Sequence, residues 1–247
     1  MNISFFEEFP DEFSLKSLNL VKFNTKLFIA DYSIEGYKVL VKKIEREYPQ
    51  VKGFVYWPVL NVREGYWFSP FSVRKALLRS IKELMDTKIN FLYDAKLPKM
   101  KMSLIFTQFF KHTKNKKYIR GFLSKCGKRA YTVESPMNVL LDNYLFLKID
   151  PKVYGNRIVK MLYSSIFLYS CDKKKRLLKE WKKEYGSKLL VGLGCTAPSI
   201  TGCKRKISVE KLKEDLKLCE EVGVKEVVIF RLGGLNKEYV DVLEKFI

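Results

Sequence analysis

The stretch "KLFIADYSIEGYKVLVKKIEREYPQVKGFVYW", residues 26–57, reads as a strand, a helix and a second strand in succession. The β-rich runs at 26–31 and 53–57 are short and apolar, as buried strands are. Between them, apolar residues of 34–48 recur at the spacing of one helical face. This strand–helix–strand unit is the pattern from which parallel sheets are built.

The same alternation continues along the whole chain. Six further strand candidates lie at 2–8, 89–95, 129–135, 144–150, 188–194 and 226–234. Helical patterns separate them, and Ser208 and Asn236 occupy helix N-cap positions. Eight strands alternating with helices over 247 residues predict a single (β/α)8 TIM-type barrel of eight parallel strands, with residues 1–247 as one domain. A doubly wound open sheet is the alternative, but no G-x-G-x-x-G turn follows the first strand.

Composition indicates a folded, soluble protein of the cytoplasm. The chain is 47% hydrophobic, and its longest apolar runs, such as 161–169, fall short of the roughly 20 residues that span a bilayer. No signal peptide is recognisable at the N-terminus, and we expect no membrane association. The five cysteines show no C-x-x-C spacing, so we expect reduced and mostly buried thiols.

The net charge of +20 suggests either an anionic partner or a lysine-rich, thermophile-like composition. The basic segments 171–183 and 203–206 are the candidates for weak nucleic-acid binding on the outside of the barrel. No recognisable RNA-binding signature, zinc knuckle or helix-turn-helix pattern joins them.

Barrel enzymes carry their chemistry at the carboxyl ends of the strands, and five of the eight predicted strands end in carboxylates. We take Glu7, Asp94, Glu134 and Lys148 as candidate catalytic residues. The single histidine, His112, excludes a histidine metal cluster and makes a Ser-His-Asp triad improbable. No cofactor is expected, although a divalent cation held by the carboxylates stays open.

Two carboxyl groups roughly 5–9.5 Å apart can hydrolyse a glycosidic bond. Asp94 and Glu134 end neighbouring predicted strands, about 4.8 Å apart, and Glu7 is the third candidate. Aromatic residues crowd the loop after the third strand, where they could cover a sugar. The candidate substrate-binding residues are Asp31, Trp57, Glu64, Tyr66 and Trp67. We expect both tryptophans to be partly exposed; the alternative is that these rings plug the barrel.

In this arrangement the chain resembles barrel glycosidases. In their largest group, a carboxylic acid ends strand four and a nucleophile ends strand seven. Asp94 matches the first position, whereas the seventh predicted strand ends in "GLGCTAP", without a carboxylate.

A second reading uses Lys148 in "LFLKIDP", because a lysine facing an apolar interior can become a neutral amine for Schiff-base chemistry. Its expected place on the sixth strand is similar to that of the lysine of class I aldolases. Barrels often bind phosphate after the last two strands. The candidate anion-binding residues there are Gly192, Gly194, Arg231, Gly233 and Gly234. We nevertheless expect Lys148 to pair with Glu134 or Asp150.

These patterns together predict a hydrolase acting on a carbohydrate or sugar-containing molecule. The alternatives are an aldolase-like lyase acting on a phosphorylated metabolite through Lys148, and a basic protein that binds nucleic acid or ribonucleoprotein without catalysis.

Overall fold

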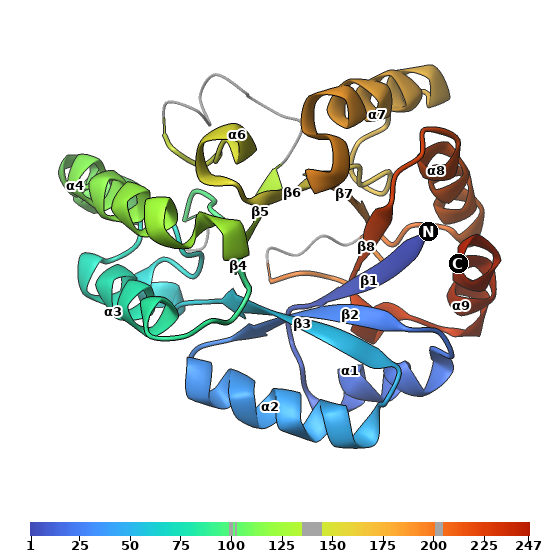
Figure 1. The fold of residues 1–247 in the computed structure, drawn as a ribbon, viewed down its shortest axis with the longest axis horizontal. Helices are drawn as coiled ribbons and strands as arrows, with labels where there is room; N and C mark the ends of the chain where they lie inside the picture. Colours follow the sequence, from blue (N-terminus) through green and yellow to red (C-terminus); the bar gives the residue numbers. More distant parts are fainter. Residues whose placement is uncertain (99–100, 102, 135–144, 201–204) are drawn as a thin grey trace. The chain divides into compact units, whose positions relative to one another are not determined.

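A computed structural model describes the chain apart from residues 99–100, 102, 135–144 and 201–204. Eight parallel strands form a closed barrel in sequence order, and helices lie between them (Figure 1). The predicted (β/α)8 barrel is therefore confirmed. The strands are β1 (Asn2–Glu7), β2 (Thr25–Asp31), β3 (Val51–Pro58), β4 (Phe91–Tyr93), β5 (Ala130–Glu134), β6 (Arg157–Met161), β7 (Leu189–Gly194) and β8 (Glu226–Phe230). The α-helices are α1 (Glu12–Lys16), α2 (Ile34–Glu47), α3 (Arg74–Met85), α4 (Ser103–Cys126), α6 (Pro151–Tyr154), α7 (Cys171–Tyr185), α8 (Val209–Glu221) and α9 (Lys237–Leu243).

The chain divides into two compact units, each assembled from separate segments. The first contains Met1–Ile29, Val41–Phe54 and Val159–Ile247, and the second contains Ala30–Leu40 and Val55–Ile158. Strands β1, β7 and β8 belong to the first unit, whereas β4 and β5 belong to the second.

The sixth strand is not where the sequence pattern placed it. The alternating apolar residues of 144–150 predicted a strand, but β6 is formed by Arg157–Met161. Phe146 has a φ of 56°, which breaks an extended conformation. Asp150 accepts a hydrogen bond from the N–H of Lys152 and starts α6, with Pro151 in its first turn. The predicted strand is therefore a connection that leads into a short helix.

In the first unit, contacts with helices show which face of each strand is the interior of the barrel. On β6, the Lys160 ammonium lies 5.4 Å from the centre of the Trp181 ring on α7, so Lys160 faces the helices. Val159 therefore faces inward, and the Cβ position of Gly192 on β7 lies 3.4 Å from it. The register pairs Gly192 with Val228, so both face the interior.

The same register carries the interior face to β1. Val228 pairs with Ser4, and Phe6 pairs with both Phe28 and Phe230. The Phe6 ring centre lies 5.0 Å from that of Phe28 and 6.2 Å from that of Phe230. Side chains alternate along a strand, so Phe5 and Glu7 lie on the outer face and Glu8 follows on the inner one.

In the second unit, the outer face is equally well defined. Tyr56 on β3 contacts Tyr37 on α2, with ring centres 4.9 Å apart, and Phe91 on β4 contacts Phe122 on α4 at 5.1 Å. Tyr56 pairs with Phe91 in the register, as expected for residues on one face. Trp57 and Leu92 are the next residues along, so they belong to the inner face.

No helix in the described part of the chain is long and apolar enough to cross a bilayer. Four cysteines are free thiols there: Cys126, Cys195 and Cys219 are buried and Cys171 is exposed. Cys203 lies outside the described residues.

Two glycines of the second unit predict opposite responses to alanine. A Cβ at Gly127 would lie 2.3 Å from the carbonyl oxygen of Tyr154, whereas a Cβ at Gly121, on α4, would meet nothing within 4 Å. We expect Gly127→Ala to lower the free energy of unfolding by about 1–3 kcal/mol. Gly121→Ala should raise it by about 0.5–1 kcal/mol, because alanine favours the helix. Urea unfolding of both variants tests this, and an equal response at the two sites would contradict it.

Candidate functional site

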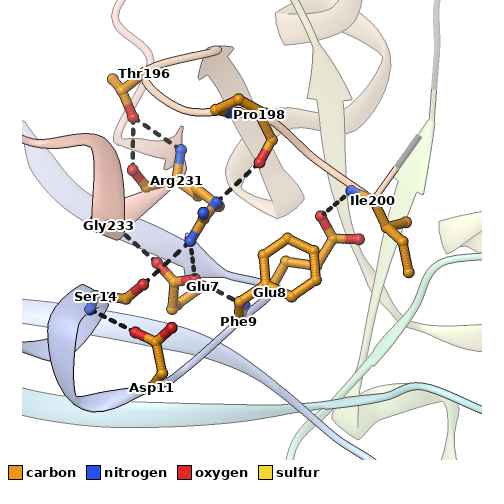
Figure 2. A network of polar contacts seen from close by, with 10 residues as sticks. All are labelled: Glu7, Glu8, Phe9, Asp11, Ser14, Thr196, Pro198, Ile200, Arg231 and Gly233. Atoms are coloured by element: carbon orange, nitrogen blue, oxygen red, sulfur yellow. Dashed lines mark hydrogen bonds and ion pairs between the residues drawn. The ribbon is translucent and has the colours of Figure 1, made fainter. Parts of the chain in front are cut away.

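Glu7, at the end of β1, is fully enclosed and has partners on both carboxylate oxygens. Oε1 accepts hydrogen bonds from the N–H of Phe9 (2.8 Å) and from Nη1 of Arg231 (2.5 Å). Oε2 accepts one from the N–H of Gly233 (2.7 Å). Figure 2 shows the Arg231 guanidinium beside the Glu7 carboxylate. The side chain of Glu7 is 0% exposed, so it is closed to a substrate.

The electrostatics of Glu7 are those of a buried ion pair. Burial raises the pKa of its carboxyl above the ordinary value, while the Arg231 charge and the N–H groups of Phe9 and Gly233 act in the opposite direction. Glu7 also lies on the outer face of β1. These contacts hold Arg231 and the chain around Glu7 in place, and the catalytic role expected for Glu7 stays a prediction.

Glu8 directly follows β1, and its side chain lies on the inner face. Its Oε2 accepts a hydrogen bond from the N–H of Ile200 (3.1 Å), and the residue is 6% exposed. Figure 2 shows Glu7 and Glu8 directed to different partners. Two consecutive carboxylates thus have different partners, because the strand turns them to opposite faces.

Arg231 joins the segments that follow β1, β7 and β8. Its Nε donates to the carbonyl of Pro198 (3.1 Å), and its Nη1 lies 3.3 Å from the Ser14 hydroxyl (Figure 2). Its backbone N–H donates to Oγ1 of Thr196 (3.0 Å). The guanidinium carbon lies 4.9 Å from the centre of the Phe9 ring. Arg231 therefore fixes the chain on both sides of Glu8.

The glycines proposed for anion binding are packed closely against neighbouring chain. A Cβ at Gly194 would lie 2.5 Å from the carbonyl oxygen of Phe230, and one at Gly234 would lie 2.5 Å from that of Thr196. Gly192 has the Tyr163 ring 3.3 Å from its Cβ position. The anion that Arg231 and the Gly233 N–H hold in this structure is the carboxylate of Glu7.

In the second unit, Asp94 directly follows β4 and has one oxygen without a partner. Its Oδ2 lies 2.9 Å from the Lys96 ammonium, while Oδ1 is buried and accepts no hydrogen bond within the described part of the chain. Lys96 is 40% exposed on its side chain and lies 5.6 Å from the centre of the Trp67 ring. Alternation from Leu92 directs Asp94 to the inner face. A carboxylate, an ammonium and an indole therefore adjoin one another.

The aromatic residues after β3 are buried, which contradicts the predicted exposure of the tryptophans. Trp57 and Trp67 are each 3% exposed, and Tyr66 is 1% exposed. Phe68 packs edge-on against Tyr93, with ring centres 5.7 Å apart. These rings complete the core beneath the loop, so the alternative reading of the segment as a plug describes it better.

Lys148 pairs with Glu134, as expected, but not on a strand. The Lys148 ammonium lies 3.8 Å from Oε2 of Glu134, and both side chains are under 10% exposed. Lys148 belongs to the connection before α6, so the similarity to the class I aldolase position is lost. The register pairs Tyr93 with Thr132, which places Glu134 on the face opposite to that of Asp94.

Asp31 and Glu64 have local structural partners. Oδ1 of Asp31 accepts a hydrogen bond from the N–H of Ser33 (3.0 Å), in the turn before α2. Glu64 forms a capping box with Asn61 and an ion pair with Arg79 at 3.1 Å.

Glu8 and Lys96 were not chosen as candidates from the sequence, although Glu8 stands beside Glu7 at the end of the first predicted strand. Glu8 could have been found by extending the alternation of Ser4 and Phe6 by one step. Lys96 follows Asp94 by two residues in a segment without regular structure, and no sequence pattern identifies it.

Arg231→Met should be more destabilising at high pH than at low pH. Burial raises the pKa of Glu7 in the folded chain, so the folded state holds this proton more tightly than the unfolded state. The contribution of Glu7 to the free energy of unfolding therefore falls as the pH rises from the ordinary pKa of a glutamate through the raised pKa of Glu7. Removing Arg231 raises the pKa further and leaves a buried charge, and we expect a loss of about 3–5 kcal/mol at pH 8.

Urea unfolding at pH 5 and pH 8 measures this effect. The loss should be smaller at pH 5, where Glu7 can take up a proton. Adding Glu7→Gln to Arg231→Met should recover stability at pH 8, and Arg46→Met, at an exposed arginine, is the matched control. Equal losses at the two pH values would rule out a buried charge as the cause.

Comparison with known proteins identifies the fold. No protein-family model matches the chain, and no curated protein matches it by sequence. Among solved structures, a GH18 chitinase from Pseudoalteromonas aurantia is similar over 100% of both chains, with a TM-score of 0.64 and 8% identity. The spore cortex-lytic enzyme SleL of Bacillus megaterium QM B1551 is similar over 100% of this chain and 74% of its own, with a TM-score of 0.57 and 11% identity. A chitinase from Chromobacterium violaceum ATCC 12472 is similar over 99% of this chain and 98% of its own, with a TM-score of 0.57 and 9% identity. At these identities the likeness establishes a shared barrel fold.

Proposed function

We propose that this chain is a carboxylate-dependent hydrolase that acts on a carbohydrate or sugar-containing substrate. The observation that carries the proposal is the state of Asp94, whose Oδ1 is buried without a hydrogen-bond partner in the described part of the chain. A buried polar atom without a partner is costly, and such atoms are often reserved for a ligand or a reaction.

The surroundings of Asp94 suit a nucleophile or general base. Lys96 holds Oδ2 at 2.9 Å and thereby orients the carboxylate, leaving Oδ1 for the reacting group. Lys96 is also partly exposed, so its remaining donors can reach a substrate hydroxyl.

Glu8, in the first unit, is a separate candidate for a reacting carboxylate, on the evidence of its own strand. In the hydrolysis of a glycosidic bond, carboxyl groups serve as acid, base or nucleophile. Glu8 follows the inner face of β1, and the N–H of Ile200 holds one of its oxygens. Glu134 is the less favoured candidate, because it lies on the outer face and pairs with Lys148.

The solved structures with the same fold support this choice of reaction by analogy. Two of those described above are chitinases, and the third is a spore cortex-lytic enzyme. Fold alone does not determine function, so the analogy only raises the expectation that the carboxylates of this barrel act on sugars.

Substituting the inward carboxylates should remove activity without unfolding the chain. On a panel of chromogenic glycosides that includes chito-oligosaccharides, we expect Asp94→Asn and Glu8→Gln each to lower kcat/KM by about 10²–10⁴-fold. Glu134→Gln should have an effect below about 10-fold, because its partner is Lys148. Melting temperatures measured in parallel distinguish lost chemistry from lost structure.

The outcome that contradicts the proposal is equally specific. If a responsive glycoside is turned over at the same rate by Asp94→Asn and by the unsubstituted chain, Asp94 has no part in the reaction. If Glu134→Gln abolishes turnover while Glu8→Gln does not, the assignment by strand face is wrong.

The ion pair of Lys148 predicts that it does not form a Schiff base. The Glu134 carboxylate 3.8 Å away holds the Lys148 side chain in an ion pair, so this amine is not directed to a carbonyl substrate. Incubation with simple aldehydes and ketones followed by borohydride should leave the mass of the Lys148 peptide unchanged. A stoichiometric adduct at Lys148 would favour the lyase.

A further inference from the structure

The positive charge of this chain is concentrated in one acid-free segment. Residues 95–133 contain no aspartate or glutamate but eleven lysines and arginines. Most of this segment is α4, whose 24 residues include Lys111, Lys114, Lys116, Lys117, Arg120 and Lys125. A lysine-rich composition throughout the chain does not explain this, because it would supply acids here as it does elsewhere.

The other basic helix is compensated by acids. On α7, Lys174 pairs with Asp215 at 2.7 Å and Lys175 pairs with Glu221 at 2.7 Å. Its own sequence also contains Asp172, Glu180 and Glu184. The second basic segment of the sequence analysis, 203–206, lies partly outside the described residues. These two segments are therefore weaker candidates for an anionic partner than α4 is.

The cations of α4 occupy its solvent side. Ile119, Phe122 and Leu123 are buried and fix the helix against its unit. The buried Asn115 amide donates to the carbonyls of Pro70 (2.9 Å) and Ser72 (3.1 Å). Figure 1 shows α4 beside α3, in the same unit.

The uncompensated cations follow one another along the exposed side of the helix. Lys111, Lys114, Lys117, Arg120 and Lys125 are exposed, and none of them forms an ion pair within the described part of the chain. Successive turns of a helix are about 5.4 Å apart. Tyr118, 47% exposed, stands among these cations. The result is a rigid row of positive charges with an accessible aromatic ring.

We propose that this exposed side of α4 binds single-stranded nucleic acid. About one cation per turn suits a polymer with one phosphate per nucleotide, and neutralised phosphates release counterions into solution. Tyr118 supplies a ring on which a base can stack, and the exposed Thr113 carries a further hydroxyl. A membrane surface is a poor fit, because the apolar side of α4 is already buried and cannot enter lipid.

Binding of fluorescein-labelled 20-nucleotide oligo(U) and oligo(A), followed by anisotropy in 50–200 mM KCl, tests the proposal. The triple variant Lys114→Gln/Lys117→Gln/Lys125→Gln should bind about 100-fold more weakly at 0.1 M salt. Each lost phosphate contact lowers the slope of log K against log salt by about 0.7, so the slope should fall by about 2. The matched control Lys38→Gln/Lys42→Gln/Lys43→Gln removes the same charge from exposed positions on α2 and should lose less than about 3-fold.

Tyr118→Ala separates nucleic acid from other polyanions. It should weaken oligonucleotide binding by about 5–100-fold, because stacking contributes about 1–3 kcal/mol per base, whereas Tyr32→Ala, at a tyrosine 63% exposed, should not. An equal loss from the α2 and α4 triple variants overturns the proposal, as does equal binding of an acidic polysaccharide with no response to Tyr118→Ala. Failure of the hydrolase proposal would leave these measurements unaffected, because none of them depends on turnover or on Asp94.

Discussion

The two-residue alternation of side chains along parallel strands is the constraint on which the rest of this structure depends. Side chains such as Phe5 and Tyr56 on one face pack beneath the helices, while Ser4, Phe6 and Gly192 lie on the face toward the barrel interior. Because register pairs share a face, one helix contact assigns the faces of a whole set of neighbouring strands. This alternation also decides whether a strand-end side chain, such as Glu7 or Glu8, points to the helices or to the interior.

At the end of β1, a buried charge is tolerated because its partners come from several parts of the sequence. The Glu7 carboxylate receives hydrogen bonds from Phe9, Arg231 and Gly233, which offset the cost of removing it from water. Arg231 in turn extends to Pro198 in the segment after β7. Connections that follow three different strands are thus held by one ion pair, and Glu8 stands beside it.

Much of the fold could be predicted from the sequence, because strand and helix periodicities are local. Seven of the eight strands coincide with predicted segments: five lie within them, and β2 and β3 extend one or two residues beyond. The sixth was misplaced because residues 144–150 alternate like a strand, while the Asp150–Pro151 helix start and the positive φ of Phe146 interrupt it. The signal of the helix start was present in the sequence, whereas the backbone angle was not.

The site was less predictable than the fold, because it depends on which way a side chain points. Strand ends inferred from a pattern are uncertain by a residue, and one residue exchanges Glu7 for Glu8. Burial could not be inferred from the sequence either. Trp57 and Trp67 are residues of the type that binds sugars, but in the structure they are buried like core residues. The Asp94–Lys96 ion pair lies in a short irregular segment, and the conformation of such a segment cannot be predicted from hydrophobic periodicity.

The adjacency of Glu7 and Glu8 affects how a mutational scan of this chain would read. Both positions would appear intolerant, and a survey that records only lost activity would give the two carboxylates one role. The two losses have different causes. A change at Glu7 leaves the guanidinium of Arg231 without its carboxylate partner, whereas a change at Glu8 removes a carboxylate from the inner face. A scan that also recorded the amount of folded protein would separate them: under the proposed assignment, substitutions at Glu7 lower the amount of folded protein, and substitutions at Glu8 lower activity alone.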